Sequence, residues 1–569
     1  MPNTFEKCDN QSEVKPLLLL PEIVSKFNDK TISVVIGVDI GTSATNVFCW
    51  LSGSGFLQNL LGDQNKGLPS NVRINNKKSK GSNKISILNG SSGKNAVFQW
   101  KKAYGAENEE DIKKITFPHK IKWSEKENTA IIIVNEEEVK VTDIMEGFLE
   151  ELAIKFKPNM KWEPQNVLMV FSYPTTWKSL TVNAFKTSVS KKMKEGLQIS
   201  NIKFVEESTA ASFYTKLPGE NGKWVKMIID MGKGTLDITI IEGTHVNNIE
   251  TQNWKVLCSK GNEKCAGSDF SLQLLKFIHD KLCQENLITY HDTLNQSTIV
   301  ESLKKGKFDT HQVLQFVEEI KENFDITKES CTLCVFNNQE TEKYNINFLD
   351  KIDDDEQKVR EIEMNTQELI NNYWSQLKME LQQTIIEAIR ESSCSEINSV
   401  MLIGGGCKLS FVKSIVEEMK ISSIEKYDHD ERNIVCHGMI NYALIDFLFP
   451  KNIQQKLKHS IFMKTYPNGM QRCVLDKSSD ILGEKRIFQI TNIKNVSLRI
   501  VIDQSLDDGN TKNIKDFQLE SNLISEQYSY FICFMIEKQD EVYKLCFSIY
   551  IQSEEGSSLL IKINEIDLE

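Results

Sequence analysis

The feature that most constrains the fold is a short segment that occurs in two distant parts of the chain. Val38-Asp-Ile-Gly-Thr and Ile229-Asp-Met-Gly-Lys-Gly-Thr each end a run of apolar, largely β-branched residues. A second apolar run follows each segment, at 45–51 and at 236–241. Two apolar runs joined through a glycine turn predict a buried β-hairpin. The chain is therefore expected to contain two hairpins of the same design.

Turns of this kind suit a nucleotide, because only glycine lets the backbone approach a phosphate closely. The aspartate before each turn can order a divalent cation and its waters, and the threonine can donate to a phosphate oxygen. A third glycine turn, Gly404-Gly-Gly, follows the apolar run 400–403 and precedes a predicted helix. That position favours a flat or anionic part of a ligand. Two such hairpins facing each other would hold phosphates from both sides.

The hydrophobic pattern predicts alternating strands and helices around these turns. Expected strands lie at 166–171, 202–205 and 400–403, and expected helices lie at 178–193, 269–282, 313–324, 361–392, 410–420 and 434–447. The segment 75–93 is rich in Ser, Asn, Gly and Lys and is predicted to be a loop. After about residue 455, alternating runs separated by polar turns predict a separate all-β module.

Composition and charge exclude several classes of protein. Lys plus Arg number 68 and Asp plus Glu number 79, which gives a net charge of −11, whereas binding to nucleic acid requires a basic field. No apolar run approaches the ~20 residues of a membrane span, and Leu17–Leu20 is too short for the core of a signal peptide. We expect no nucleic-acid partner, no membrane span, and a location in the cytoplasm or the nucleus.

The motifs, taken in order, resemble a known family. The two hairpin turns resemble the two phosphate loops of the actin, sugar kinase and heat-shock ATPase superfamily, and Leu402-Ile-Gly-Gly-Gly resembles its adenosine loop. Val205-Glu-Glu-Ser-Thr-Ala-Ala and Cys265-Ala-Gly-Ser-Asp-Phe are similar to segments of the heat shock 70 kDa (DnaK-type) ATPases. Together these motifs span residues 34 to 448.

Within that family the chain is most similar to a divergent branch, heat shock 70 kDa protein 12. Three segments resemble it: Ser172-Tyr-Pro-Thr-Thr-Trp, Lys120-Ile-Lys-Trp and Phe449-Pro-Lys-Asn-Ile. A short β-rich tail in place of the full peptide-binding domain fits the same branch.

The resemblance implies an α/β fold: a two-lobed actin-like ATPase of duplicated ribonuclease H-like mixed sheets with flanking helices, followed by a small β-rich C-terminal module. It divides the chain into an N-terminal extension at 1–32, the nucleotide-binding domain at 33–452 and the β-rich module at 453–569. The tail is too short for a β module together with a long helical lid.

The resemblance also implies roles for individual residues, with ATP or ADP and Mg²⁺ as cofactors. Asp39 and Asp230 would hold the water shell of the metal. Glu207 and Asp237 would position the metal and the attacking water, and Lys122 would stabilise charge on the terminal phosphate. The residues expected to bind the phosphates and the nucleoside are Gly41, Thr42, Ser43, Gly232, Lys233, Gly234, Thr235, Gly404, Gly405, Gly406, Lys408, Glu318 and Lys321.

Simpler structural roles stay open for several of these residues. Glu207 would also suit the start of a helix, and Lys122 would suit an ordinary surface position. Glu318 and Lys321 are three residues apart and would form a plain exposed pair on a helix. Asp237 is the residue that most needs a function, because a charge inside an apolar strand is costly.

The chain departs from the family pattern at three positions near the nucleotide. Lys233 stands where the second phosphate loop has glycine. Glu322 and Lys408 stand where arginines contact the adenosine, and an ammonium or a carboxylate stacks on a base less well than a guanidinium does. The acidic, leucine-rich linker of typical members is also absent. These departures put the nucleotide preference and the rate of turnover in question.

Three functions are compatible with these residues. The first is an ATP-binding, slowly ATP-hydrolysing, chaperone-like protein without a full peptide-clamp lid, whose C-terminal module binds protein clients or regulatory proteins. The second is a degenerate nucleotide sensor or scaffold with little turnover. The third is a small-molecule kinase of the same superfamily, against which the Glu-Ser-Thr-Ala-Ala segment and the β-rich tail argue.

Overall fold

The structure is a computed structural model of the 569-residue chain. After residue 448 it describes the course of the strands but not their side chains. The described residues are 15–16, 32–52, 56–61, 67–79, 82–87, 96–114, 119–134, 136–160, 162–214, 222–245, 253–290, 295–323, 328–338, 342–348, 358–425, 433–448, 453–455, 461–466, 470–475, 486–490, 498–505, 511–519, 529–539, 542–553 and 556–568.

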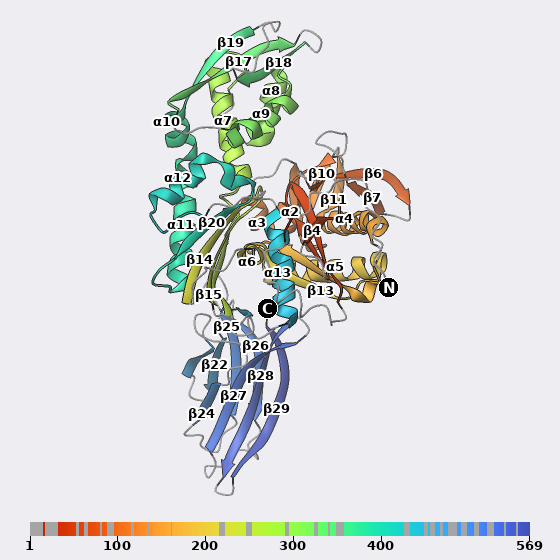
Figure 1. Cartoon of the computed structure of the whole chain (residues 1–569), viewed down its shortest axis with the longest axis vertical. Coiled ribbons are helices and arrows are strands. Elements are labelled where there is room, and N and C mark those ends of the chain that lie inside the picture. Colours follow the sequence, from red (N-terminus) through yellow and green to blue (C-terminus); the bar gives the residue numbers. More distant parts are fainter. Residues whose placement is uncertain are drawn as a thin grey trace.

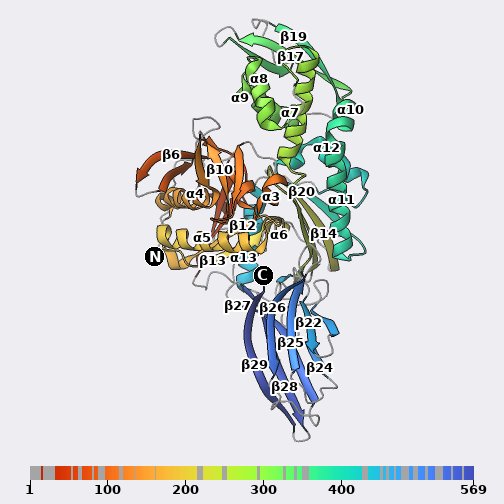
Figure 2. The same ribbon diagram turned by 180° about the vertical axis from the view of Figure 1, so that it is seen from behind.

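Two lobes lie side by side, with an arm at one end of the molecule and long β-strands at the other (Figure 1). The same arrangement is seen from behind in Figure 2. The first lobe contains residues up to about 214, and the second lobe contains most of the residues from 222 to 425. This architecture agrees with the two-lobed α/β fold expected from the sequence.

The first lobe is built on a mixed sheet whose central strand is β2 (Val34–Ile40). β2 pairs antiparallel with β3 (Ala44–Leu51) and parallel with β12 (Val167–Tyr173), which in turn pairs parallel with β13 (Ile202–Glu206). β4 (Phe56–Asn59) extends the sheet beyond β3, and β1 (Lys15–Pro16) and β5 (Leu68–Pro69) add short edge pairings. Every residue of β2 is buried, as its uninterrupted apolar run predicts.

Helices cover both faces of this sheet. Val34 and Ile36 pack in one cluster with residues of α4 (Val141–Phe156) and α5 (Ser179–Leu197). Val35, which points to the other face, packs in a cluster with α13 (Ile434–Leu448). The period of two in a strand therefore divides β2 between two hydrophobic cores.

Smaller elements complete the first lobe. β6 (Val72–Ser79), β7 (Ser82–Ile87) and β8 (Ala96–Val97) form one sheet, and β9 (Lys120–Ser124), β10 (Thr129–Val134) and β11 (Glu137–Lys140) form another. The short helices α2 (Trp100–Tyr104) and α3 (Glu109–Lys114) lie between them in sequence. The loop predicted at 75–93 is wrong for 75–79 and 82–87, because the apolar residues Val72, Ile74 and Ile85 anchor a hairpin against α4.

The second lobe repeats the design of the first. β14 (Gly222–Met231) pairs antiparallel with β15 (Leu236–His245) and parallel with β20 (Ser399–Ile403). β16 (Asn253–Asn262) follows β15, and β21 (Ile453–Gln455) adds to its far side in parallel. The strand at 453–455, which the domain prediction assigned to the tail, is thus hydrogen-bonded into the sheet of this lobe.

The second lobe contains one long helix with a π-helical segment inside it. Its three parts, α10 (Thr366–Leu369), η5 (Ile370–Trp374) and α11 (Ser375–Ser392), follow one another without a gap. The predicted start of this helix at 361 is wrong. Residues 358–365 form β19 (Lys358–Asn365), and the Asn365 side chain caps the helix by accepting from the N–H of Glu368.

The arm at the end of the second lobe consists of helices packed on a small sheet. Its helices are α7 (Gly267–Gln284), α8 (Gln296–Lys305) and α9 (Thr310–Asn323), and its strands are β17 (Ser330–Asn338), β18 (Lys343–Phe348) and β19. η6 (Gly405–Lys408) and α12 (Ser410–Glu418) follow β20. α7 begins at the sheet and runs into the arm (Figure 1).

Two helices join the lobes at their base. α6 (Glu207–Ser212) packs on β14 and β15 of the second lobe, and α13 packs on β2 and β3 of the first. The two helices cross at Gly438, where a Cβ would collide with the carbonyl oxygen of Ala210. Small residues at the crossing therefore allow the lobes to share one hydrophobic cluster.

The strands after residue 455 form two four-stranded antiparallel sheets, with the orders β23-β22-β25-β26 and β24-β27-β28-β29. Their bounds are β22 (Ile461–Tyr466), β23 (Met470–Leu475), β24 (Arg486–Ile490), β25 (Leu498–Ser505), β26 (Thr511–Leu519), β27 (Ser529–Gln539), β28 (Val542–Ser553) and β29 (Gly556–Leu568). Within the described ranges, no helix is long and apolar enough to cross a membrane. Apart from 15–16 and 32, the predicted N-terminal extension lies outside these ranges.

Candidate functional site

Each of the two predicted hairpin turns is closed by an equivalent backbone hydrogen bond. The N–H of Gly41 donates to the carbonyl oxygen of Ala44, and the N–H of Gly232 donates to that of Thr235, both at 3.0 Å. The turns also face each other, because a Cβ on Gly234 would collide with the hydroxyl oxygen of Thr42. Glycine at 234 therefore lets a turn from each lobe meet in the cleft.

The second turn is fixed from behind by α7. The N–H of Gly267 donates to the carbonyl oxygen of Gly232 at 2.9 Å, and the N–H of Ser268 donates to that of Lys233 at 3.0 Å. Amide groups at a helix N-terminus otherwise lack partners. Here they hold the turn in place.

The third glycine turn, at 404–406, lies against Asp230 of the second lobe. Gly404 has φ +82°, and a Cβ there would lie 2.6 Å from Oδ1 of Asp230. Gly406 is buried beside Met231, whereas Gly405 and Lys408 are exposed. The structure thus brings all three predicted glycine turns together, with Ser43 exposed on the first of them.

Four carboxylates are buried where the turns converge: Asp39, Asp230, Asp237 and Glu207. In the strand register Asp230 stands opposite Asp237, and Asp39 stands opposite Asn46. The Ser172 hydroxyl donates to Asp39, and the N–H of Thr175 donates to Asp237, both at 2.9 Å. The second of these bonds joins the two lobes at the acidic site.

Burial and mutual repulsion alter the acidity of this group. Loss of solvation, followed by the charge of Glu207, raises the pKa of Asp39 to about 6 and that of Asp237 to about 7. The same two causes raise the pKa of Asp230 well above its usual range, and Asp237 and Asp39 add to the effect. When all four groups are ionised, the site therefore carries more negative charge than Lys101 compensates.

Lys101 is the cation that the structure places among these carboxylates. It extends from α2, its ammonium pairs with Oε1 of Glu207, and it lies over the ring of Trp177, 5.6 Å from the centroid. Its charge lowers the pKa of Asp39, Asp230 and Asp237. The sequence interpretation missed Lys101, although two consecutive lysines between Trp100 and Ala103-Tyr104 are an unusual pattern that could have indicated it.

Lys122, the lysine predicted for this role, lies elsewhere. It is on β9, in the separate sheet of β9 to β11. Its side chain is 48% exposed and pairs with Glu138 at 2.5 Å. The structure therefore does not bring Lys122 to the carboxylates, because the spacing along the chain gave no information on which lysine crosses to the cleft.

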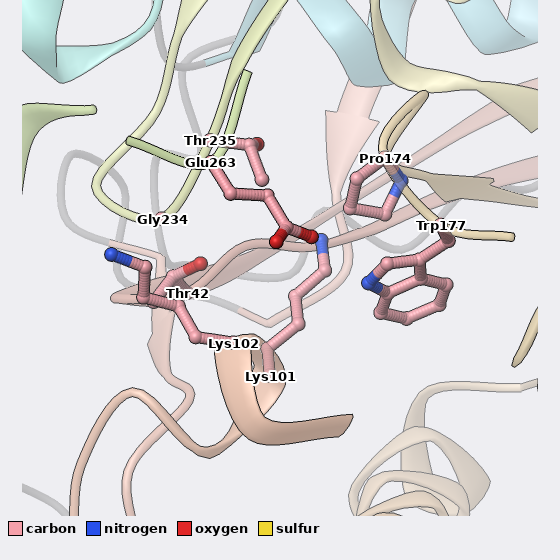
Figure 3. Close-up of a pocket in the computed structure, with 8 residues that line it drawn as sticks. All are labelled: Thr42, Lys101, Lys102, Pro174, Trp177, Gly234, Thr235 and Glu263. Carbon is pink, nitrogen blue, oxygen red and sulfur yellow. The ribbon is translucent and has the colours of Figure 1, made fainter. Parts of the chain in front are cut away.

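Thr42, Gly234 and Thr235 line a pocket together with both lysines of α2 (Figure 3). Pro174, Trp177 and Glu263 complete its walls. Figure 3 shows that Lys101 and Lys102 leave the same helix in different directions. The pocket presents glycine-turn backbone, hydroxyl groups and ammonium groups, which together are the chemistry of a phosphate site.

Two of the residues predicted to bind the nucleotide, Lys321 and Lys233, contact a third, Glu318 on α9. The buried ammonium of Lys321 donates to Glu318 at 2.6 Å and to the Ser271 hydroxyl at 2.9 Å. Lys233 reaches the same carboxylate from the second turn, at 3.6 Å. Burial alone would raise the pKa of Glu318, but Lys233 and Lys321 lower it to about 2. Glu318 and Lys321 are therefore not a plain exposed pair. The side chain of Glu322 lies outside the described residues.

The donor set fits a magnesium ion held through water. In the described ranges, no three His, Cys, Asp or Glu side chains are close enough to ligate a metal directly. Four buried carboxylates with one paired lysine nevertheless leave an excess of negative charge, and carboxylate oxygens suit a hard divalent cation that keeps several waters. Asp39 and Asp230, at the ends of equivalent strands, are the residues that would hold such a shell.

Residues 35–438 match the family model described as Hsp70 protein. The match covers more than half of the chain. It runs from β2 through both lobes into α13 and includes every residue of the acidic site and the phosphate pocket.

Proposed function

The chain belongs to the Hsp70 family, and from this premise we propose that it binds ATP or ADP with Mg²⁺ between its lobes and hydrolyses ATP slowly. The observation that carries the proposal is the buried cluster of Asp39, Asp230, Asp237, Glu207 and Lys101 beside two glycine turns. Family membership supports an ATP-binding, chaperone-like function. The slow rate and the missing lid are our extension of it.

In the proposed reaction each protein group has a separate task. A bound magnesium ion would offset the charge of the phosphate oxygens. Asp237, buried opposite Asp230 in the hairpin, would orient the attacking water and take its proton. Lys101, which pairs with Glu207, would stabilise the charge that develops on the terminal phosphate.

A titration of the full-length protein with ATP and with ADP in magnesium, followed by single-turnover hydrolysis, tests the proposal. We expect micromolar binding and slow hydrolysis. Lys101→Met should reduce hydrolysis at least 100-fold, whereas the matched change Lys122→Met on the exposed sheet should leave it unchanged. A folded wild-type protein that binds neither nucleotide would refute the proposal, as would equal activity in the two variants.

One observation favours the sensor or scaffold as a second candidate. Lys233 adds a side chain to the second turn and ties it to Glu318 on α9, so the turn is less free to adjust during turnover. If the protein is a sensor, wild type should bind ATP without hydrolysing it. Lys233→Gly should then gain measurable hydrolysis. Transfer of phosphate to a small alcohol or acid in either variant would instead favour the kinase.

We further propose that the chain belongs to the heat shock 70 kDa protein 12 branch and acts on proteins of the cytoplasm or nucleus. The two antiparallel sheets after residue 455 would bind clients or regulatory proteins. β21, which pairs with β16, supports a connection between these sheets and the nucleotide cleft. The full chain should slow the aggregation of a heat-denatured enzyme, and to different extents in ATP and in ADP. Equal curves with and without the protein would contradict this.

A further inference from the structure

Lys102 is a buried lysine that the proposed reaction does not use. Its side chain is 2% exposed, and its ammonium donates to the Ser268 hydroxyl at 2.9 Å. Two carboxylates act on its charge: Asp269, whose Oδ2 is 4.0 Å away, and Glu263, which lines the same pocket. Burial lowers the pKa of Lys102. An ammonium removed from water needs a close counter-charge to offset the lost solvation, whereas this one donates to a neutral hydroxyl.

The neighbouring lysine shows what full compensation looks like. Lys101 pairs directly with Glu207. Asp269, by contrast, already accepts the N–H of Ala266 at 2.9 Å as part of the start of α7. Of the two consecutive lysines, Lys101 therefore contacts a carboxylate directly, whereas Lys102 donates to a hydroxyl, with Asp269 4.0 Å away and Glu263 acting on its charge.

The stem of Lys102 runs along the phosphate pocket. A Cβ on Gly234 would lie 3.3 Å from Cγ of Lys102, so the side chain passes directly beside the second turn. Lys102 also lines the pocket that contains Lys101, Thr42 and Thr235 (Figure 3). Lys101, which the proposed reaction assigns to the terminal phosphate, lines the same pocket, so Lys102 lies at the end of the site where bond cleavage is proposed.

Lys102 also connects the two lobes. It belongs to α2 of the first lobe, whereas Ser268 and Asp269 begin α7 of the second. A lysine side chain has several rotatable bonds and can move its ammonium by a few ångströms without a change in the backbone. An anion in the pocket would compete with Ser268 for it.

We infer that Lys102 is a second phosphate-binding cation, which leaves Ser268 and binds the terminal phosphate of a nucleoside triphosphate. This inference rests on the proposed nucleotide site. A diphosphate lacks the terminal group and leaves Lys102 on Ser268. The contact between α2 and α7 therefore differs between the two nucleotides, and Lys102 is a residue that distinguishes ATP from ADP.

The test is the ratio of affinities for two nucleotides. Dissociation constants of the full-length protein are measured by titration with magnesium ADP and with the magnesium salt of a non-hydrolysable imido analogue of ATP. Lys102→Met removes one charged hydrogen bond to the triphosphate. We therefore expect a tenfold or greater loss of triphosphate affinity, with less than a threefold change for ADP. Lys102→Arg should keep most of the affinity. Lys113→Met, an exposed lysine on α3, should match wild type for both.

The outcomes separate this inference from the proposed function. If wild type binds neither nucleotide, the proposed function fails and the inference fails with it. If wild type binds both, and Lys102→Met weakens both equally or neither, only the inference fails. A purely structural lysine would lower both affinities together and would not change their ratio.

A second variant guards against a Lys102→Met protein that does not fold. Ser268→Ala removes the hydroxyl that holds the ammonium in the absence of a phosphate, while the lysine itself is kept. We expect two- to threefold tighter binding of the triphosphate analogue and unchanged binding of ADP. An unchanged or reduced ratio in Ser268→Ala would overturn the inference on its own.

Discussion

The hairpins of the two lobes have the same backbone plan. β2–β3 and β14–β15 each close with a hydrogen bond from the first glycine of the turn to the carbonyl oxygen three residues later. In each lobe the aspartate-bearing strand pairs antiparallel with its hairpin partner and parallel with a later strand, β12 or β20. Both turns offer glycine backbone to a ligand.

The side chains opposite the two aspartates differ. Asn46 stands opposite Asp39, and Asp237 stands opposite Asp230. Asn46 donates to Asp39 and lowers its pKa, whereas the charge of Asp237 raises that of Asp230. The two hairpins thus have equivalent backbones, but in the second lobe alone the residue opposite the aspartate is a further carboxylate. We propose that the second hairpin supplies the base of the reaction, Asp237, and that the first hairpin binds the ligand without supplying a base.

The largest expected effect comes from removing that asymmetry. Asp237→Asn gives the second lobe the amide that the first lobe already has. We expect single-turnover ATP hydrolysis to fall at least 100-fold, because the proposed base is lost, and ATP affinity to change less than threefold. Hydrolysis within tenfold of wild type would show that the catalytic asymmetry lies elsewhere.

The reciprocal change should affect stability. Asn46→Asp adds a fifth carboxylate to the buried group, and we expect it to cost about 2 kcal/mol of unfolding free energy at pH 8. The cost should shrink at pH 5, where the new group is protonated. Asn46→Ala, which loses the amide without adding charge, should show no such pH dependence in denaturant titrations. Equal pH profiles of the two variants would contradict repulsion as the cause.

The contact between the two turns can be tested by adding one methyl group. Gly234→Ala places a Cβ against the hydroxyl of Thr42 in the opposite lobe. We expect about a tenfold loss of ATP affinity and a lower melting temperature, in line with ~1–3 kcal/mol for overpacking. Gly405→Ala serves as the stability control, because a Cβ there meets nothing within 4 Å. Equal melting temperatures of the two variants would show that the turns do not touch in solution.

The smallest expected effect is a pH dependence of the ligand-free protein. The folded pKa values of Asp39 and Asp237, about 6 and 7, lie above the ordinary value of 3.8. Their contribution to stability is present at low pH and is lost as pH rises through 6 to 7. Wild type should melt a few degrees lower at pH 8 than at pH 5.

Other groups must be separated from that effect. Burial lowers the pKa of His119 to about 4, so this histidine acts in the opposite direction as pH falls. The informative quantity is therefore the difference between wild type and Asp237→Asn, which should grow from pH 5 to pH 8. A constant difference would show that Asp237 is ionised over the whole range.

Local sequence patterns were sufficient for the frame of the site. The apolar runs at 34–40 and 236–241 are buried strands, and the glycine turns lie where the sequence places them. Asp237 is 1% exposed, so the carboxylate that the sequence places inside an apolar strand is buried. These features depend on a few neighbouring residues, so they can be read without the fold.

The errors fell where distant segments meet. The hairpin of β6 and β7 has the composition of a loop and is ordered by packing on α4, and the helix predicted from 361 gives way to a strand that pairs with β17. Lys122 and Lys101 look alike in the sequence. Only the position of α2 beside the cleft distinguishes them, because which lysine reaches a carboxylate more than a hundred residues away depends on the whole lobe.

The sequence by itself determined the family, the two hairpins, the glycine turns and the four carboxylates, because strand periodicity and turn chemistry act over a few residues. The tertiary structure alone decided that the turns face each other across two lobes, that Lys101 joins the carboxylates, and that Lys102 lies buried against Ser268. The physical reason is that charge compensation depends on distance through space, which the order of residues along the chain does not specify.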